Sequence, residues 1–138
     1  MNIAILGSGA WGCTLAHHLS KMGEHHLVLW EHNPERRDEL AQKRRPFGIT
    51  EYRLDESIQI TSDLKDVIDC CRTLIVVIPA QEVSGFVTQV EKLIKDSEHK
   101  TSDYQFLLAS KGIDLEKRLP LSSFFEQSFP HNSFAVLS

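Results

Sequence analysis

A glycine-rich segment near the amino end constrains the fold of this chain more than any other feature. It reads Gly-Ser-Gly-Ala-Trp-Gly at positions 7–12, directly after a short apolar run at positions 2–6. Beyond it, apolar residues recur every three or four positions, which predicts one face of a helix that ends near Gly23. The apolar positions with this spacing are Trp11, Leu15, Leu19 and Met22. A buried strand, a glycine turn and a helix in this order are typical of the first unit of an α/β domain.

Strand and helix patterns continue to alternate along the chain. The further predicted strands lie at positions 27–30, 58–60, 73–78, 104–109 and 133–137, and the further helices at 35–43, in a brief segment ending near 68, at 83–94 and at 121–129. Asn33 is expected to cap the second helix, and Thr61 or Ser62 the third. Because the run at 73–78 is apolar on both faces, we expect it near the centre of the sheet.

This alternation predicts the fold class. It indicates an α/β fold with a doubly wound, mainly parallel, Rossmann-like sheet. A chain of 138 residues suffices for one core. Because no internal linker or repeat divides the sequence, we expect residues 1–138 to form a single domain.

The three glycines of the turn have distinct predicted roles. Gly7 permits the tight turn, Gly9 lets the backbone approach a pyrophosphate, and Gly12 lets helix and strand pack closely. Glu31 lies nineteen residues after Gly12, at the end of the second predicted strand. There, an acidic side chain can accept hydrogen bonds from both hydroxyls of an adenosine ribose. This context predicts a dinucleotide-binding site, and the alternative is a glycine-rich turn that binds nothing.

The residues around Glu31 leave the choice between NAD and NADP open. The charge of Glu31 would repel a 2′-phosphate, which favours NAD. His32, Arg36 and Arg37 begin the next helix and could turn toward a 2′-phosphate, or the arginines could form a solvated helix face. Trp11 either shields the cofactor or packs in the core.

Composition and charge argue against several other classes. Nineteen acidic and fifteen basic side chains give a net charge of -4, the opposite of the basic surface expected of a nucleic-acid-binding protein. The apolar runs are far too short for a signal peptide or a membrane span. Three cysteines without a Cys-x-x-Cys spacing fit a reduced, cytoplasmic setting, and the seven histidines show no spacing that brings two imidazoles to one metal ion. We therefore expect no nucleic acid, membrane or metal partner.

Five segments, in order along the chain, carry a resemblance to a known enzyme family. They are Gly-Ser-Gly-Ala-Trp-Gly-Cys-Thr-Leu-Ala at 7–16, Val-Leu-Trp at 28–30, Val-Val-Ile-Pro at 76–79, Ser-Lys-Gly-Ile-Asp at 110–114 and Ala-Val-Leu-Ser at 135–138. Over its whole length the chain resembles NAD(P)-dependent glycerol-3-phosphate dehydrogenase. The tryptophan between the second and third glycines and the Lys-Gly-Ile-Asp segment are far more specific than the glycines alone.

The resemblance implies that residues 1–138 are the NAD(P)-binding domain of a longer, two-domain oxidoreductase. That family interconverts sn-glycerol 3-phosphate and glycerone phosphate by hydride transfer, for phospholipid synthesis. The resemblance also implies that Ala10, Trp11 and His32 contact the dinucleotide, and that Lys111 contacts both cofactor and substrate. Lys111 follows the carboxyl end of a predicted strand, where ligands gather in open parallel sheets; the alternative is a surface lysine in a turn.

The catalytic lysine of that family lies in a helical domain that these 138 residues lack, so no catalytic residue is expected within this chain. We expect the isolated chain to bind NAD or NADP without turning over substrate. In the whole enzyme we expect a small phosphate substrate. A homodimer is one assembly that the whole enzyme could form. Phe134, Val136 and some of Phe124, Phe125 and Phe129 are expected near an incompletely covered apolar surface.

Two other assignments stay open at this point. Another two-domain reductase, of the ketopantoate reductase or sugar-nucleotide dehydrogenase type, has the same opening, although the Lys-Gly-Ile-Asp segment argues against it. A freestanding nucleotide-binding module with no chemistry would also fit the glycine turn. The continuation of the gene would test the first alternative, and tight binding by the isolated chain would support the second.

Overall fold

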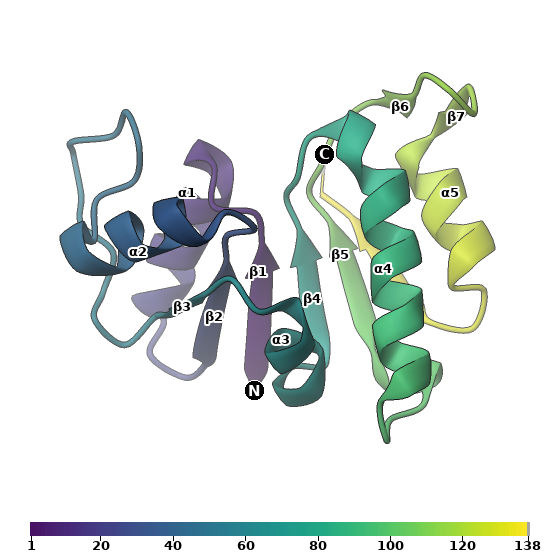
Figure 1. Ribbon diagram of the computed structural model, residues 1–138, viewed down its shortest axis with the longest axis horizontal. Coiled ribbons are helices and arrows are strands. Elements are labelled where there is room, and N and C mark those ends of the chain that lie inside the picture. The colour runs from purple at the N-terminus through teal and green to yellow at the C-terminus, as the bar shows by residue number, and fades with distance from the viewer. Residues whose placement is uncertain (138) are drawn as a thin grey trace.

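The computed structural model describes residues 1–137, and its centre is a six-stranded parallel sheet (Figure 1). In spatial order the strands are β3 (Gln59–Thr61), β2 (His26–Trp30), β1 (Asn2–Leu6), β4 (Thr73–Val76), β5 (Gln105–Leu108) and β8 (Ser133–Val136). Neighbouring strands all run parallel. The predicted doubly wound α/β fold is confirmed, and the apolar run at 73–78 supplies one of the two central strands. Ser138, the last residue of the quoted motifs, lies outside the described residues.

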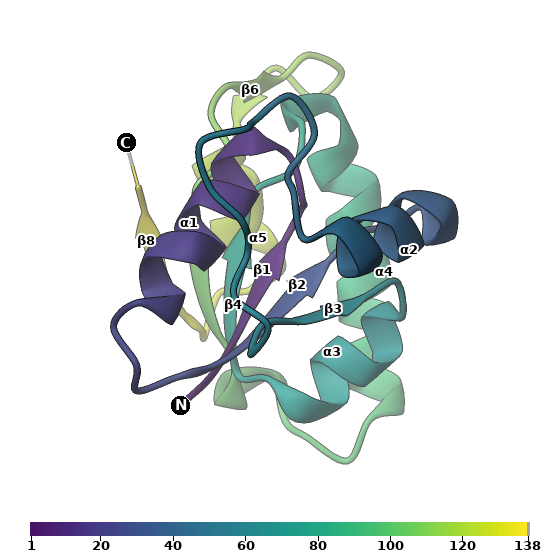
Figure 2. The same cartoon turned by 90° about the vertical axis from the view of Figure 1, so that its left-hand side faces the viewer.

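Within residues 1–137, five α-helices flank the sheet. They are α1 (Ala10–Ser20), α2 (Pro34–Lys43), α3 (Leu64–Cys70), α4 (Val83–Asp96) and α5 (Leu121–Ser128), with short 3-10 turns η1 (Ala80–Glu82) and η2 (Thr101–Asp103). One core lies between the sheet and α3, α4 and α5; a second lies under α1, α2 and the 44–57 loop. Figure 2 shows α1 on one side of the sheet and α3 and α4 on the other.

Helix α1 packs against the core with only the middle of the apolar face that its spacing predicts. Leu15 and Leu19 lie against the core, whereas Trp11 is 47% exposed and Met22, beyond the end of the helix, is 58% exposed. The buried residues of the helix are Gly12, Cys13 and Ala16. These small side chains let the helix axis approach β1 closely, and a tryptophan would hold the two elements apart.

Side-chain caps begin two of the helices. The side chain of Asn33 accepts hydrogen bonds from the N–H groups of Glu35 and Arg36, as predicted for α2. For α3 the predicted cap at Thr61 or Ser62 is wrong, because Asp63 holds that position. Thr61 is still paired with Trp30 in the sheet, so the helix can only begin later.

The expected uncovered apolar surface at the carboxyl-terminal end is wrong for Phe124, Phe125 and Phe129, but Phe134 lines a hollow on the uncovered face of the sheet. The first three side chains are buried. On β5, Phe106 stacks on Phe129 with ring centroids 4.4 Å apart, and Phe134 stacks on Phe125 at 5.8 Å. Val136 remains 51% exposed. Helix α5 therefore covers most of the apolar surface that the sequence left unassigned.

A small antiparallel hairpin, β6 (Ile113–Asp114) and β7 (Leu119–Pro120), follows β5 where the sequence predicts no strand. The buried Asp114 side chain accepts the N–H groups of Glu116 and Lys117, each at 2.9 Å, and this turn joins the two short strands. The hairpin leaves Lys111 immediately beyond the carboxyl end of β5.

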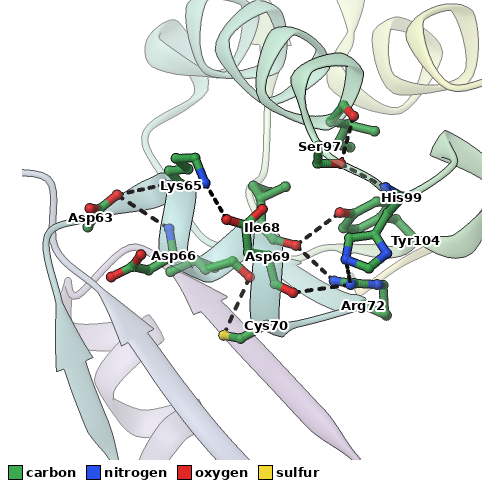
Figure 3. Close-up of polar contacts among 12 residues, drawn as sticks. Asp63, Lys65, Asp66, Ile68, Asp69, Cys70, Arg72, Ser97, His99 and Tyr104 are labelled. Carbon is green, nitrogen blue, oxygen red and sulfur yellow. Dashed lines mark hydrogen bonds and ion pairs between the residues drawn. The ribbon is translucent and has the colours of Figure 1, made fainter.

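At the opposite, amino end of the sheet, the Arg72 side chain fastens α3 to the segment before β5 (Figure 3). Its guanidinium donates to the carbonyl oxygens of Ile68 and Cys71, at 2.8 and 2.9 Å, and to that of Asp69 at 3.1 Å. It also contacts the His99 ring nitrogen and lies 5.0 Å from the centroid of the Tyr104 ring. These bonds satisfy carbonyl groups that the end of a helix leaves unpaired.

Candidate functional site

A cleft of about 850 Å³ opens at the carboxyl ends of the central strands. Its walls include residues that follow four parallel strands closely: Gly7 after β1, Glu31 after β2, Val77 after β4 and Ala109 after β5. In open parallel sheets, ligands bind at the carboxyl ends of the strands, at the point where the strand order changes direction. Here that point lies between β1 and β4, because β2 and β3 follow on one side of it and β4, β5 and β8 on the other. The volume falls within the range of roughly 300–1,000 Å³ that is typical of small-molecule and cofactor sites.

The three glycines of the turn occupy their positions for different physical reasons. Gly7 has φ of 125°, and a Cβ there would lie 2.3 Å from the Val77 carbonyl oxygen. A Cβ on Gly12 would lie 1.9 Å from the Gly7 carbonyl oxygen, so a larger residue would force the turn away from α1. A Cβ on Gly9 would meet nothing within 4 Å. Packing within the chain therefore requires Gly7 and Gly12, whereas Gly9 leaves open space beside the cleft.

Helix α1 begins at this turn without the kind of cap that α2 and α3 have. Its N-cap residue is Gly9, and no side chain of residues 1–137 accepts a hydrogen bond from its first N–H groups. Those N–H groups and the positive end of the helix dipole are free to attract an anion. Because Gly9, Ala10 and Trp11 line the cleft, an anion bound to them would lie inside it.

Glu31 is a buried carboxylate in the cleft wall, only 5% exposed. Its Oε2 accepts a hydrogen bond from the Ser8 hydroxyl. Its Oε1 accepts the Asn33 N–H at 2.9 Å and lies 3.1 Å from Nδ1 of His32. The side chain is thus oriented by donors from two loops, one after β1 and one after β2.

The Cys13 thiol lies beneath the turn and is not an available nucleophile. Its Sγ donates to the Ser8 carbonyl oxygen at 3.2 Å, and the residue is buried. Burial, reinforced by the nearby negative charge of Glu31, raises the pKa of Cys13 to about 12. The thiol therefore stays protonated and neutral at physiological pH.

The opposite wall of the cleft is formed by the segments after β4 and β5. The buried Ser110 hydroxyl donates to the Ile78 carbonyl oxygen at 2.6 Å and accepts the Ile78 N–H at 2.9 Å, which ties the two strand ends together. Lys111 follows it, exposed and in the cleft wall. On α4, Phe86 packs against Trp30 from β2, with ring centroids 5.7 Å apart. Together Phe86 and Trp30 make part of the cleft wall apolar.

The structure brings all eight sequence-predicted site residues into this one cleft. They are Gly7, Gly9, Ala10, Trp11, Gly12, Glu31, His32 and Lys111. The exposure of Trp11 decides against its packing in the core. Arg36 also lines the cleft, with its guanidinium 4.5 Å from the centroid of the Phe47 ring, while Arg37 pairs with Asp38 at 3.0 Å.

Several lining residues were missed by sequence reasoning. Ser8, Phe86, Gln89 and Ser110 all line the cleft. Ser8 is the variable position between two motif glycines, and Ser110 is the first polar residue after β5. Both could therefore have been identified from the neighbouring motif or strand. Phe86 and Gln89 lie three residues apart on α4, but that spacing alone predicts only a shared helix face.

Three further observations concern metal ligands, membrane-spanning helices and the remaining thiols of the described residues. No group of three or more His, Cys, Asp or Glu side chains in residues 1–137 could hold a metal ion. Over the same residues, no helix has the length and apolar character needed to cross a membrane. The thiols of Cys70 and Cys71 lie 3.4 Å apart at the end of α3, away from the cleft.

Known proteins match the chain along its whole length. A profile of the family described as NAD-dependent glycerol-3-phosphate dehydrogenase N-terminus matches residues 2–138. The glycerol-3-phosphate dehydrogenase [NAD(P)+] of Hydrogenovibrio crunogenus is 33% identical over 140 aligned residues, which cover 100% of this chain and 40% of that protein. The chain thus spans about 40% of the length of such curated relatives.

Solved structures agree with the sequence matches. The crystal structure of glycerol-3-phosphate dehydrogenase from Coxiella burnetii superposes with a TM-score of 0.83 at 25% identity, over 98% of this chain and 39% of that one. A putative 2-dehydropantoate 2-reductase from Enterococcus faecalis reaches a TM-score of 0.68 at 17% identity, over 99% of this chain and 40% of that one, a likeness of fold alone. The chain belongs to the family of NAD-dependent glycerol-3-phosphate dehydrogenase N-terminal domains.

Proposed function

We propose that the cleft binds NAD(H), with the pyrophosphate at the start of α1 and the adenosine ribose at Glu31. The observation that carries this proposal is the uncapped first turn of α1, which opens onto a cleft of cofactor size beside the unfilled space at Gly9. Gly7, Ala10 and Trp11 supply the surrounding wall, and Gly12 keeps α1 close to β1. A diphosphate would supply the acceptors that the first N–H groups lack within the chain.

The same site favours NAD over NADP. A 2′-phosphate would approach the buried carboxylate of Glu31, and two negative charges at that distance repel each other strongly where water is excluded. His32 is engaged with Glu31, and the guanidinium of Arg36 lies over the Phe47 ring. All three side chains that could meet a 2′-phosphate, His32, Arg36 and Arg37, therefore already have partners in the chain.

In the whole protein, this domain would serve a glycerol-3-phosphate dehydrogenase, which interconverts sn-glycerol 3-phosphate and glycerone phosphate for phospholipid synthesis. The bound cofactor supplies and accepts the hydride. Lys111 stands at the carboxyl end of β5, where its ammonium group can meet the cofactor and a phosphate or carbonyl oxygen of the substrate. The resemblance to the family assigns exchange of the alcohol proton to a lysine that these 138 residues do not include, so we expect the isolated chain to bind the cofactor without turning over substrate.

Titration with NADH, followed by the fluorescence of Trp11 and Trp30, tests the proposal because both indoles line the cleft. A saturable change is expected. Gly9→Ala should fold normally, since its methyl group meets nothing in the chain, yet should weaken binding at least about tenfold by occupying the space of the pyrophosphate.

Gly48→Ala is the control for that experiment. Gly48 also has open space at the Cβ position, but its φ of 73° makes alanine strained there, so this variant loses some stability. Because Gly48 lies outside the cleft, its NADH binding should nevertheless be unchanged. No saturable signal at millimolar NADH would overturn the proposal. Reduction of NAD by the isolated chain in the presence of sn-glycerol 3-phosphate would contradict the statement that it is inactive.

A reductase of the ketopantoate or sugar-nucleotide type is the weaker candidate. It has only the likeness of fold to the solved reductases in its favour, whereas the family profile covers nearly the whole chain.

A further inference from the structure

The contact between Ser8 and Glu31 joins two parts of the cleft that lie 23 residues apart in sequence. Ser8 is 4% exposed and Glu31 is 5% exposed, so both groups are removed from solvent. A buried carboxylate that lacks hydrogen-bond donors is costly, so its donors decide whether it stays in place. The Ser8 hydroxyl is therefore part of what keeps a negative charge in this wall.

The three donors to Glu31 differ in how firmly they are held. Ser8 belongs to the glycine turn, and the Asn33 N–H belongs to the backbone at the start of α2. The His32 side chain is 68% exposed and can leave its place at Oε1 without disturbing the fold. Within residues 1–137, the Glu31 carboxylate has the His32 ring beside it and forms an ion pair with no lysine or arginine. Ser8 and Asn33 are thus the fixed partners, one on each oxygen.

This arrangement limits what the carboxylate can still accept. A carboxylate offers about four acceptor positions on its two oxygens. Ser8 uses one on Oε2, while Asn33 and His32 use those on Oε1. One position on Oε2 therefore remains for an incoming hydroxyl, and a second becomes open only when His32 turns away. The earlier expectation that Glu31 accepts both ribose hydroxyls is thus conditional on His32.

We propose that Ser8 is a positioning residue, which holds the Glu31 carboxylate in the cleft wall and thereby sets the preference for a free ribose 2′-hydroxyl over a 2′-phosphate. This inference rests on the proposed binding of NAD(H) in the cleft. Without the Ser8 hydroxyl, Oε2 loses its fixed donor and the carboxylate can turn toward solvent. The carboxylate then repels a 2′-phosphate less strongly, because it lies farther from it. The glycine turn and the pyrophosphate site stay as they are.

The test compares dissociation constants for NADH and NADPH, measured by tryptophan fluorescence on the wild-type chain, S8A, E31Q and the double variant. A hydrogen bond to a charged group contributes more free energy than one between neutral groups. S8A should therefore reduce the NADH-over-NADPH preference, the ratio of the two dissociation constants, by about fivefold or more. E31Q removes the charge and should reduce it at least as far. If Ser8 acts through Glu31, adding S8A to E31Q should change the ratio by less than about twofold.

Ser20→Ala is the matched control, because it also removes a serine hydroxyl that donates one hydrogen bond, to the His17 carbonyl oxygen at 2.8 Å, but at the far end of α1. Its preference should equal that of the wild type. An unchanged ratio in S8A, or equal effects of S8A with and without Glu31, would overturn the role of Ser8 while leaving the proposed function intact. Failure of the wild type to bind either cofactor would overturn both.

Discussion

The two halves of the sheet differ in how their faces are covered. The half formed by β3, β2 and β1 lies between α1, α2 and the 44–57 loop on one face and α3 and α4 on the other. The half formed by β5 and β8 carries α4 and α5 on one face, the near one in Figure 1. Its other face holds a shallow hollow of about 230 Å³. Residues that line the hollow include Thr73, Gln105, Leu107, Ser133 and Ala135.

The strand sequences explain this difference. β1 and β2 end in four consecutive buried residues each, so both of their faces are apolar. In β5 and β8, polar or small side chains such as Gln105, Ser133 and Ala135 alternate with buried or half-buried aromatic residues. A strand buried on both faces must be apolar throughout, whereas alternation suffices for a strand with one open face. The distribution of residues along each strand therefore anticipates which half is doubly covered.

The largest expected difference between the halves comes from a matched pair of charges. Ala4→Asp places an unpaired carboxylate in a fully buried position of β1 and should prevent folding at 25 °C, because such a charge costs more than a typical domain can lose. Ala135→Asp places the same group on exposed β8 and should change the free energy of unfolding by less than about 0.5 kcal/mol. Circular dichroism and urea unfolding of both variants measure this; a stable Ala4→Asp protein would contradict the comparison.

A smaller difference is expected from truncation of a leucine in each half. Leu29→Ala, at a fully buried position in β2, should lower the free energy of unfolding by about 3–4 kcal/mol, because it removes contacts on a covered face. Leu107→Ala, half-buried at the open face of β5, should cost only about 1 kcal/mol, since solvent and neighbouring side chains can fill the space. Equal costs in urea unfolding would show that the open face is covered in solution.

The smallest expected effect concerns Arg72, which directly precedes β4 at the amino end of the sheet, between the two halves. Arg72→Lys should lower the free energy of unfolding by about 1–2 kcal/mol, because an ammonium group cannot reproduce the forked bonds to three carbonyl groups. NADH binding should be unchanged, because the cleft lies at the other end of the strands. Lys65→Ala is the control: its surface pair with Asp69 should give no measurable shift of the urea midpoint. A large loss of NADH binding in Arg72→Lys would contradict this separation.

Much of the candidate site could be predicted because its signals are local in sequence. Gly7 needs its backbone conformation, and Gly12 needs close contact with the turn just before it. Asn33 caps the helix that directly follows it. Such requirements act over a few residues, so they can be recognised before the fold is known.

Other features escaped prediction because they depend on segments distant in the chain. Leu54, in a polar loop, is buried in the core under α1 and α2, and Trp11 lies at the cleft although its spacing favours the core. Neither placement follows from periodicity, because Leu54 joins a core built from distant segments and the place of Trp11 depends on how close α1 comes to β1. The small residues Gly12, Cys13 and Ala16 determine that distance.

The sequence by itself determined the alternation of the six sheet strands with the helices, the glycine-rich turn and the family, since these rest on short motifs and on apolar periodicity. Only the tertiary structure decided which residues meet across the cleft, above all that the Ser8 hydroxyl reaches Glu31 and that Arg36 lies over Phe47. The reason is physical: a motif specifies a local backbone shape, whereas hydrogen bonds between loops depend on the packing of whole elements, which no local pattern encodes.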